Sequence, residues 1–574
     1  MKLMHQAETK TCQNCKQNFV IEPEDFEFYE KIKVPAPTWC PKCRFQRRLS
    51  CQNLINLYKR KCDLCGKDSV SMYAPEAPFK VYCPECWWSD KWDPHEYGRD
   101  YDFSRPFFEQ WGEMFHEVPL LGLANDLQTV KDSPYNNNAG HLKNCYLLFH
   151  AYSNKDSAYG AILWHNESVM DCAFMHTNEL LYDCMHSHKC SKCVGSRRQA
   201  VESRECFFCR DVINSQNCFA SANLHNKKYH IFNKPYSKED YFKEIAKYDL
   251  GSYKTYQEIK RLAEEHWKKF SPKPRYDNFS VNSTGDFVFY SKNCKECFEV
   301  VGAEDSKYLF LIADGPVQDC YDISVSWGNN FSLAYEATAS GDHATNIKFC
   351  QNAGIGLHDA EYSKLSLSKG SNHFGCVSMK GGDYVILNKH YGEKEFGELR
   401  EKIRKHMNKM PYVDKNGRIY KYGEFFPAEI NPYAYNETIA QNFFPLTKEQ
   451  AEKQGYWWRD SDKKEYKTTK KSAELLDHIK DAEVNILQEV IECQKCAKGY
   501  KIIPMELQFL REMNLPLPRE CPICRINEKF SSHIKSLRIL KRACSKCAAI
   551  FETSHPENET PYILCKDCYQ KEVV

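Results

Sequence analysis

The chain has 574 residues, of which 42% are hydrophobic and 27% charged, and its formal net charge is +2. This length exceeds what one ordinary hydrophobic core organises, so several domains are expected. The nearly neutral charge excludes a protein that is basic or acidic throughout, and any affinity for nucleic acid must come from local patches.

The cysteine content indicates the compartment. There are 30 cysteines, yet residues 1–10 contain no apolar segment typical of a secretion signal. No apolar run in the sequence reaches the length needed to cross a bilayer. We therefore expect a cytoplasmic protein without membrane association. Its thiols are then reduced, and closely spaced cysteine pairs are metal ligands more often than disulfides.

Residues 1–90 form the first predicted domain, a double zinc ribbon. Two Cys-x-x-Cys turns present four thiolates to one ion, and such a tetrahedral sulfur site favours zinc over harder cations. No histidine or carboxylate replaces a thiolate, so no coordination position remains open for water and the zinc is structural rather than catalytic. The predicted ligands of two ions are Cys12, Cys15, Cys40, Cys43, Cys62, Cys65, Cys83 and Cys86.

A basic segment lies between these cysteine pairs. Arg47, Arg48, Lys59 and Arg60 fall in a stretch that has no acidic residue between Cys40 and Asp63. A rigid zinc framework that carries clustered cations suits phosphate contacts, which position a protein on nucleic acid without specifying sequence. The alternative is a solvated charged face.

An aromatic docking linker is predicted at residues 91–135. The cluster of rings begins at Trp87 and continues through Trp92, Phe107 and Trp111. Exposed rings stack on unpaired bases, whereas buried rings would fasten the zinc module to the open end of the solenoid. We favour docking.

The centre of the chain is an internal duplication. Cysteine or aromatic residues recur about every dozen positions in residues 136–236 and again in 276–391. Each half closes alike, with Tyr229 to Tyr236 matching Tyr384 to Tyr391. A period of one dozen residues fits two short strands per coil, so we predict a mainly β fold with a duplicated right-handed parallel β-solenoid. Residues 237–275 are predicted to be a helical connector between the halves.

The cysteines inside the solenoid have two interpretations. Free cysteines pack well as small buried apolar groups, which explains most of these positions. Four of them have the spacing of a ribbon and would suit a fifth zinc ion: Cys190, Cys193, Cys206 and Cys209.

Residues 392–490 are predicted to contain a helix and an aromatic linker that wraps the second half, with a further helix near 471–491. Residues 491–574 then repeat the first module. The interval from Cys493 to Cys521 equals that from Cys12 to Cys40, 28 positions. Two more zinc ions are expected, and Arg538, Lys541 and Arg542 are further candidate phosphate contacts. The predicted zinc ligands are Cys493, Cys496, Cys521, Cys524, Cys544, Cys547, Cys565 and Cys568.

The cysteine pairs with Phe19, Phe28-Tyr29 and Pro35-x-Pro37 ahead of Cys40-x-x-Cys43-Arg44 resemble the probable zinc-ribbon domain family of bacterial proteins. The whole chain is also similar to multidomain zinc-ribbon proteins of candidate-phyla bacteria. The resemblance implies ligand roles for Cys12, Cys15, Cys40 and Cys43. It implies no reaction, and Leu510 departs from the motif in the far copy.

These features favour a zinc-binding scaffold whose basic modules bind nucleic acid, either RNA, DNA or a ribosome. One alternative is a scaffold for protein partners. Another is a solenoid enzyme acting on carbohydrate, an inference from fold analogy alone, with Asp171, Asp183, Glu205 and Asp319 as candidate carboxylates. No glycine-rich phosphate loop or nucleophile elbow occurs, so enzymatic activity is not expected.

Overall fold

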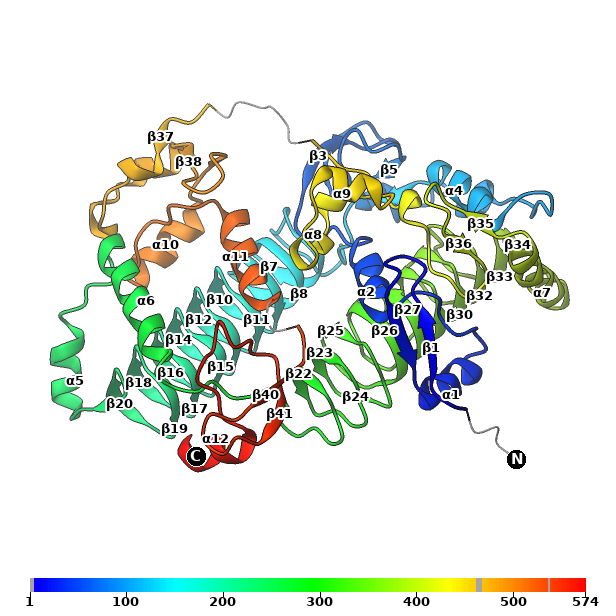
Figure 1. The fold of residues 1–574 in the computed structure, drawn as a ribbon. Coiled ribbons are helices and arrows are strands. Elements are labelled where there is room, and N and C mark those ends of the chain that lie inside the picture. The colour runs from blue at the N-terminus through cyan, green and yellow to red at the C-terminus, as the bar shows by residue number, and fades with distance from the viewer. Residues whose placement is uncertain (1–4, 461–466, 535–536, 574) are drawn as a thin grey trace. The chain divides into compact units, whose positions relative to one another are not determined.

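The computed structural model describes residues 5–460, 467–534 and 537–573. The chain divides into two compact units. Unit 1 joins the residues up to Leu123 to Asp277–Asp460, and unit 2 joins Ala124–Tyr276 to the residues that follow position 466. Each unit therefore contains one half of the solenoid and one cysteine-rich module (Figure 1). Within the described ranges, no helix combines the length and the apolar character that crossing a bilayer requires.

The solenoid half of unit 2 is a parallel coil with two strands per turn. Most residues pair with residues twelve positions later, as Glu167 does with Glu179, and one coil has thirteen, as between Ser187 and Ala200. The odd-numbered strands β9 to β19 form one side of the coil and the even-numbered strands β10 to β20 the other. The predicted fold class is confirmed, because the dozen-residue period is the length of one coil. The strands are β7 (Asn137–Lys143), β8 (Tyr146–Lys155), β9 (Ala158–Trp164), β10 (Glu167–Met170), β11 (Ala173–His176), β12 (Glu179–Tyr182), β13 (Met185–His188), β14 (Ser191–Val194), β15 (Arg197–Val201), β16 (Arg204–Phe207), β17 (Arg210–Ile213), β18 (Gln216–Phe219), β19 (Ala222–His225), β20 (Lys228–Ile231) and β21 (Lys234–Pro235).

The solenoid half of unit 1 repeats this architecture with coils of twelve to fourteen residues. Gly285 pairs with Cys297, twelve positions on, whereas Val317 pairs with Phe331, fourteen positions on. The strands are β22 (Gly285–Phe289), β23 (Cys297–Val301), β24 (Ala303–Glu304), β25 (Phe310–Ile312), β26 (Val317–Ser326), β27 (Phe331–Thr338), β28 (Thr345–Lys348), β29 (Gln351–Ala353), β30 (Leu357–Glu361), β31 (Lys364–Ser366), β32 (Gly370–Phe374), β33 (Gly382–Ile386) and β34 (Lys389–His390).

Tight bends at regular intervals close each coil. In much of both halves every third residue has a positive φ, for example Ser168, Asp171 and Phe174 at 52°, 54° and 57°. Asparagine and aspartate tolerate this left-handed conformation better than most residues. Where they recur on adjacent coils they also bond to each other, as Asn144 Nδ2 does to Asp156 Oδ1 at 2.7 Å.

Both halves end with the same hairpin, as their matching sequences predict. The turns Phe232-Asn233 and Leu387-Asn388 have positive φ at both residues, as in a type I′ turn. The short strands β21 and β34 fold back antiparallel on the last coil. They protect a strand edge that would otherwise be free to pair with another chain.

Each cysteine-rich module contains two ribbons. The inner ribbon carries the first cysteine cluster of its module: β1 (Glu8–Thr11), β2 (Asn18–Ile21), α1 (Pro23–Lys31) and α2 (Pro41–Leu49) in unit 1, and β38 (Ile491–Glu492), β39 (Gly499–Tyr500), α10 (Pro504–Glu512) and α11 (Pro522–Ile534) in unit 2. The outer ribbon carries the second cluster: β3 (Tyr58–Lys61), β4 (Asp68–Ser71), β5 (Val81–Tyr82) and α3 (Pro84–Trp87) in unit 1, and β40 (Leu540–Ala543), β41 (Ile550–Thr553) and α12 (Lys566–Val573) in unit 2.

The aromatic linker of unit 1 docks on its solenoid half. The rings of Trp92, Phe107 and Trp111 are buried, and Phe107 packs against Tyr362 and Phe374 at centroid distances of 5.2 and 5.5 Å. These buried rings are unavailable for base stacking, so docking is the better interpretation. The linker contains α4 (Phe107–Glu117) and β6 (Leu120–Leu121).

The remaining helices of unit 2 are α5 (Lys238–Ile245) and α6 (Tyr253–Trp267) in the predicted connector, and those of unit 1 are α7 (Glu393–Lys409), α8 (Ile439–Phe443) and α9 (Lys448–Lys453). Unit 1 also has a short antiparallel pair, β35 (Tyr412–Val413) with β36 (Ile419–Tyr420).

The prediction of a helix near 471–491 is wrong. That segment contains strand β37 (Lys470–Lys471) and three 3-10 turns, at Ser472–Glu474, Ile479–Asp481 and Val484–Gln488. Several of its apolar residues are buried in the core of unit 2, and one or two of them lie in or directly after each short turn.

Candidate metal centres and their docking surfaces

Sixteen cysteines gather into four clusters of four, as the spacing predicts. In each cluster the sulfur atoms lie within 4.8 Å of one another. Each cluster joins two consecutive Cys-x-x-Cys turns, so the pairing that the sequence left open is now defined. The clusters are Cys12, Cys15, Cys40 and Cys43; Cys62, Cys65, Cys83 and Cys86; Cys493, Cys496, Cys521 and Cys524; and Cys544, Cys547, Cys565 and Cys568.

The sulfur geometry fits zinc. A tetrahedral site with Zn–S bonds of about 2.3 Å has sulfur atoms separated by about 3.8 Å. The pairs Cys15–Cys40, Cys496–Cys521 and Cys547–Cys565 are each 3.7 Å apart. The donor set is thiolate alone, which suits a soft or borderline ion and leaves no open position. A bound zinc ion would therefore order the ribbon and would not activate water.

Backbone amides support the first thiol of every cluster. The N–H of the third cysteine donates to the first sulfur at 3.2 Å in Cys40–Cys12, with the same contact in the other three clusters. Burial raises the pKa of Cys544, but the N–H groups of Cys565, Cys547 and Lys546 outweigh it and lower the pKa to about 6. A thiol held this way is ready to bind metal as a thiolate.

The prediction of a fifth zinc site inside the solenoid is wrong. Cys190, Cys193, Cys206 and Cys209 are buried in the solenoid, and no three of their sulfur atoms come within 4.8 Å of one another. Cys206 Sγ lies instead 3.4 Å from the carbonyl of Arg204 and 3.6 Å from that of Ser215. Their spacing resembles a ribbon only because coils of about twelve residues bring cysteines inward at regular intervals.

Serine should replace these inner cysteines at small cost. Ser203 Oγ already makes the equivalent contacts, with the carbonyls of Val201 and Val212 at 2.9 and 3.4 Å. We expect Cys206→Ser to change the free energy of unfolding by less than about 1.5 kcal/mol, the value of one hydrogen bond. Zinc content measured by mass spectrometry should stay unchanged. A loss of one zinc per chain would instead restore the fifth site.

The inner ribbon of unit 1 docks on the solenoid through buried ion pairs. Helix α2 begins at the Cys40 turn and lies against β26 and β27 (Figure 1). Arg44 Nη2 and Arg48 Nη1 contact the two oxygens of Asp322 at 2.8 and 2.9 Å. All three side chains are at most 1% exposed. Buried charges of this kind are tolerated only when paired, so the pairs fix where α2 can lie.

Arg47 completes this interface. Its guanidinium contacts Glu336 at 2.9 Å and Glu424 at 3.4 Å, and it stacks over the Trp39 ring at 4.3 Å. The prediction that Arg47 and Arg48 contact phosphate is wrong. Their guanidinium groups are buried against carboxylates of the same chain. The sequence showed the cations but not the acidic partners, which lie more than 270 positions away.

The inner ribbon of unit 2 repeats this arrangement on helix α11, which packs on β9 and β11. Arg525, the counterpart of Arg44, pairs with Asp171 and with Glu506, and Lys529 pairs with Asp183. Burial would raise the pKa of Asp183, but the cations of Arg197, Lys260 and Lys529 lower it well below its ordinary value. Asp183 is therefore charged.

The carboxylates suggested for a solenoid enzyme do not form an open site. Asp171 and Asp183 are buried under α11 and neutralised by its cations. Asp319 pairs with Lys31 at 2.7 Å in unit 1, whereas Glu205 lies on β16 in unit 2. Asp25 was not identified from the sequence as an acidic residue that holds the inner ribbon on the solenoid. It pairs with Lys307 at 2.8 Å. Its counterpart in the other module is Glu506, so the constant offset between the two modules could have revealed both residues.

The outer ribbons place the other candidate phosphate contacts differently. Arg60 donates hydrogen bonds to the carbonyls of Ala74 and Phe79, and Arg542 donates to those of His555 and Thr560. Both guanidinium groups therefore use part of their hydrogen-bonding capacity within their own ribbon. The remaining three candidates are exposed on or beside the hairpins β3–β4 and β40–β41: Lys59, Arg538 and Lys541.

No protein-family model matches the chain, and no curated protein matches it. One comparison with solved structures finds a putative acetyltransferase from Desulfovibrio desulfuricans, 11% identical, which covers 51% of this chain and 85% of its own. Its TM-score is 0.10, too low to carry any argument about fold or function.

Proposed function

We propose that the protein is a zinc-ordered scaffold that binds nucleic acid through its two outer ribbons. One observation carries the proposal: the arginines of α2 and the two cations of α11 are taken up by buried ion pairs within each unit, whereas Lys59 and Lys541 of the outer ribbons stay exposed beside a cysteine cluster. Exposed cations on a rigid frame suit phosphate contacts.

The charge of the hairpins β3–β4 and β40–β41, the first part of each outer ribbon, supports this proposal. Residues 537–553 carry four cationic side chains and a single acidic one, Glu552, and residues 58–71 carry four cations against two acids. The overall net charge of +2 gives no such excess. Phosphate recognition would therefore be local, and its affinity would depend steeply on salt.

The solenoid halves supply the supporting surface. Each presents a regular parallel sheet on which an inner ribbon is held by buried ion pairs, and the outer ribbon follows directly in the chain. Zinc fixes the turns from which α2 and α11 start. A scaffold of this kind presents its basic hairpins in a defined orientation on each unit without contributing a reaction.

The charge-reversed variant Lys59→Glu with Lys541→Glu tests the proposal. We expect weaker binding of fluorescein-labelled single-stranded RNA, measured by fluorescence anisotropy from 50 to 300 mM salt. The slope of log K against log salt should fall by about one for each phosphate contact removed. The control is Lys402→Glu on the exposed face of α7, which should leave both affinity and slope unchanged.

Equal loss in the control and the test variant would mean that only total charge matters, and would contradict a specific ribbon surface. Absence of salt-dependent binding to both RNA and duplex DNA would overturn the proposal. Nuclease-resistant recovery of protein partners from a lysate would then favour the alternative scaffold for proteins.

A further inference from the structure

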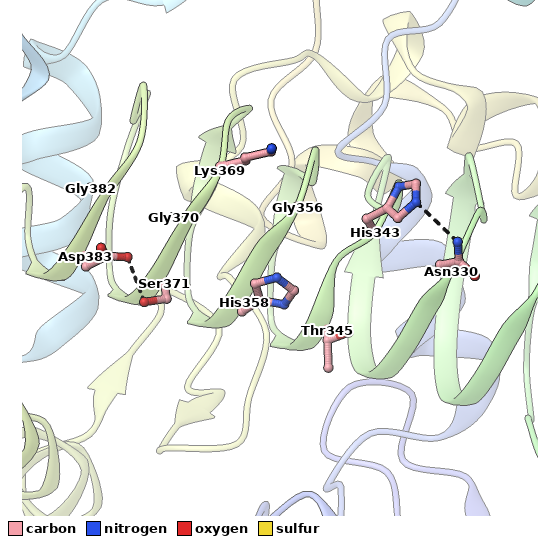
Figure 2. A pocket seen from close by; sticks show the side chains of 10 residues that line it. All are labelled: Asn330, His343, Thr345, Gly356, His358, Lys369, Gly370, Ser371, Gly382 and Asp383. Atoms are coloured by element: carbon pink, nitrogen blue, oxygen red, sulfur yellow. Dashed lines mark hydrogen bonds between the residues drawn. The ribbon is translucent and has the colours of Figure 1, made fainter.

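An open groove runs along the solenoid half of unit 1, and nothing in the proposed function uses it. It has a volume of about 710 Å³ and crosses successive coils from Asn330 to Asp383 (Figure 2). No part of either zinc ribbon lines it. The groove is therefore a separate feature of the solenoid surface.

Two rows of polar side chains border the groove. One row follows the strand register, in which Thr345 pairs with His358, His358 with Ser371 and Ser371 with Asp383. In Figure 2 these side chains follow one another from coil to coil, and Asn330, His343 and Lys369 form the second row. Polar groups thus repeat at the spacing of the coils.

Some of these groups are held in place and others remain available. Asn330 bonds to His343 at 3.2 Å, and Ser371 donates to Asp383 at 2.7 Å. Among the described residues, the side chains of His358 and Lys369 form no hydrogen bond or ion pair within the chain, and both are exposed. The bonded pairs orient the rows, and the two free side chains can bind a ligand.

Glycines leave room between the rows. Gly356, Gly370 and Gly382 all line the groove. A Cβ at Gly370 would lie 2.5 Å from the carbonyl oxygen of Gly382, so no larger residue fits there without a backbone shift. With no side chains at these positions, a ligand can approach the backbone closely.

The chemistry of the groove excludes several ligand classes. Its only fully charged side chains are Lys369 and Asp383, of opposite sign, which is too little positive charge for a polyanion. None of the lining side chains within the described chain is apolar. The strands β28, β30, β32 and β33 are paired on both sides, so no free edge is available for an extended peptide.

We propose that this groove binds a linear, neutral oligosaccharide. Hydroxyl groups both donate and accept hydrogen bonds, as do the imidazole, hydroxyl and amide groups in the two rows. A chain of sugar units would meet a polar side chain of this row at each successive coil. The glycines admit the sugar rings, while His358 and Lys369 supply unused hydrogen-bonding capacity.

The solenoid half of unit 2 also carries a polar hollow along its coils. In unit 2 a hollow of about 540 Å³ is lined by His165, Thr177 and Lys189, with Glu167 and Glu179 on the neighbouring row. These residues also recur every twelve positions, two residues apart between rows. A polar groove is thus a feature of both halves, although the side chains and charges differ.

The test uses the full chain and isothermal titration with two neutral probes, cellohexaose and maltohexaose. We expect at least one to bind with a dissociation constant at or below roughly 1 mM. Ser371→Trp should raise that constant at least tenfold by filling the groove, and His358→Ala should weaken binding without adding bulk. Lys292→Trp, an exposed position outside the groove, is the control and should change nothing.

Three results would overturn the proposal: neither hexasaccharide binds saturably, binding is indifferent to Ser371→Trp and His358→Ala, or the groove variants affect only binding of polygalacturonate or of an oligonucleotide. The Lys59→Glu with Lys541→Glu variant should bind the sugar normally. That result separates this site from the outer ribbons.

Discussion

Replacing Asp322 with alanine is expected to lower the free energy of unfolding of unit 1 by about 3–5 kcal/mol, the cost of leaving a buried ion pair without one partner. Arg44 and Arg48 both contact this carboxylate, and both are at most 1% exposed. Their charges would remain buried without their closest counter-ion. Hydrogen exchange of the α2 amides should therefore become about a hundredfold faster or more, because the ribbon opens more often.

The matched control is Asp319→Ala, on the same strand β26. Asp319 also makes an ion pair, with Lys31 at 2.7 Å, but Lys31 is half exposed and solvent screens the interaction. Its loss should cost about 0–1 kcal/mol. Equal effects of the two substitutions would contradict the role of Asp322 as the anchor of the inner ribbon.

Removal of metal is expected to have the largest effect of all. Structural zinc contributes about 10–16 kcal/mol in small finger peptides, far more than any single side-chain contact. Treatment with a strong chelator should unfold the ribbons, and limited trypsin digestion should then cut residues 12–90 and 493–573. Peptides of the solenoid halves should stay protected, because their thiols pack inside the coil and, among the described residues, none of them belongs to a four-cysteine cluster.

Two controls accompany the chelator experiment. Readdition of zinc should restore protection of the ribbons, since the ligands are all present in the chain. Magnesium should not restore it, because a thiolate site disfavours a hard cation. Ribbons that remain resistant to trypsin after complete loss of metal would contradict the account.

Much of the fold and the four cysteine clusters could be predicted, because the patterns that specify them are local in the sequence. Two Cys-x-x-Cys turns specify their own site, since each turn places two thiols on one ion. The dozen-residue period likewise specified the coil, because one coil is one repeat. Both signals lie within about 30 residues of sequence.

The function of the cations was not predictable in the same way. Arg47 and Arg48 look like a basic surface in sequence, and only folding brings Glu336 and Asp322 to them from far along the chain. The false fifth zinc site has a related cause, because a ribbon and a solenoid both place cysteines at regular spacing. Segment 471–491 has apolar residues enough for a helix, but its three short turns follow the surface that it packs against.

Zinc K-edge X-ray absorption on the purified chain, with the metal quantified in the same sample, tests the central claim most directly. We predict four zinc ions per chain, each with four sulfur ligands at about 2.3 Å. A folded chain that holds essentially no metal, or zinc bound mainly by nitrogen and oxygen, would contradict it.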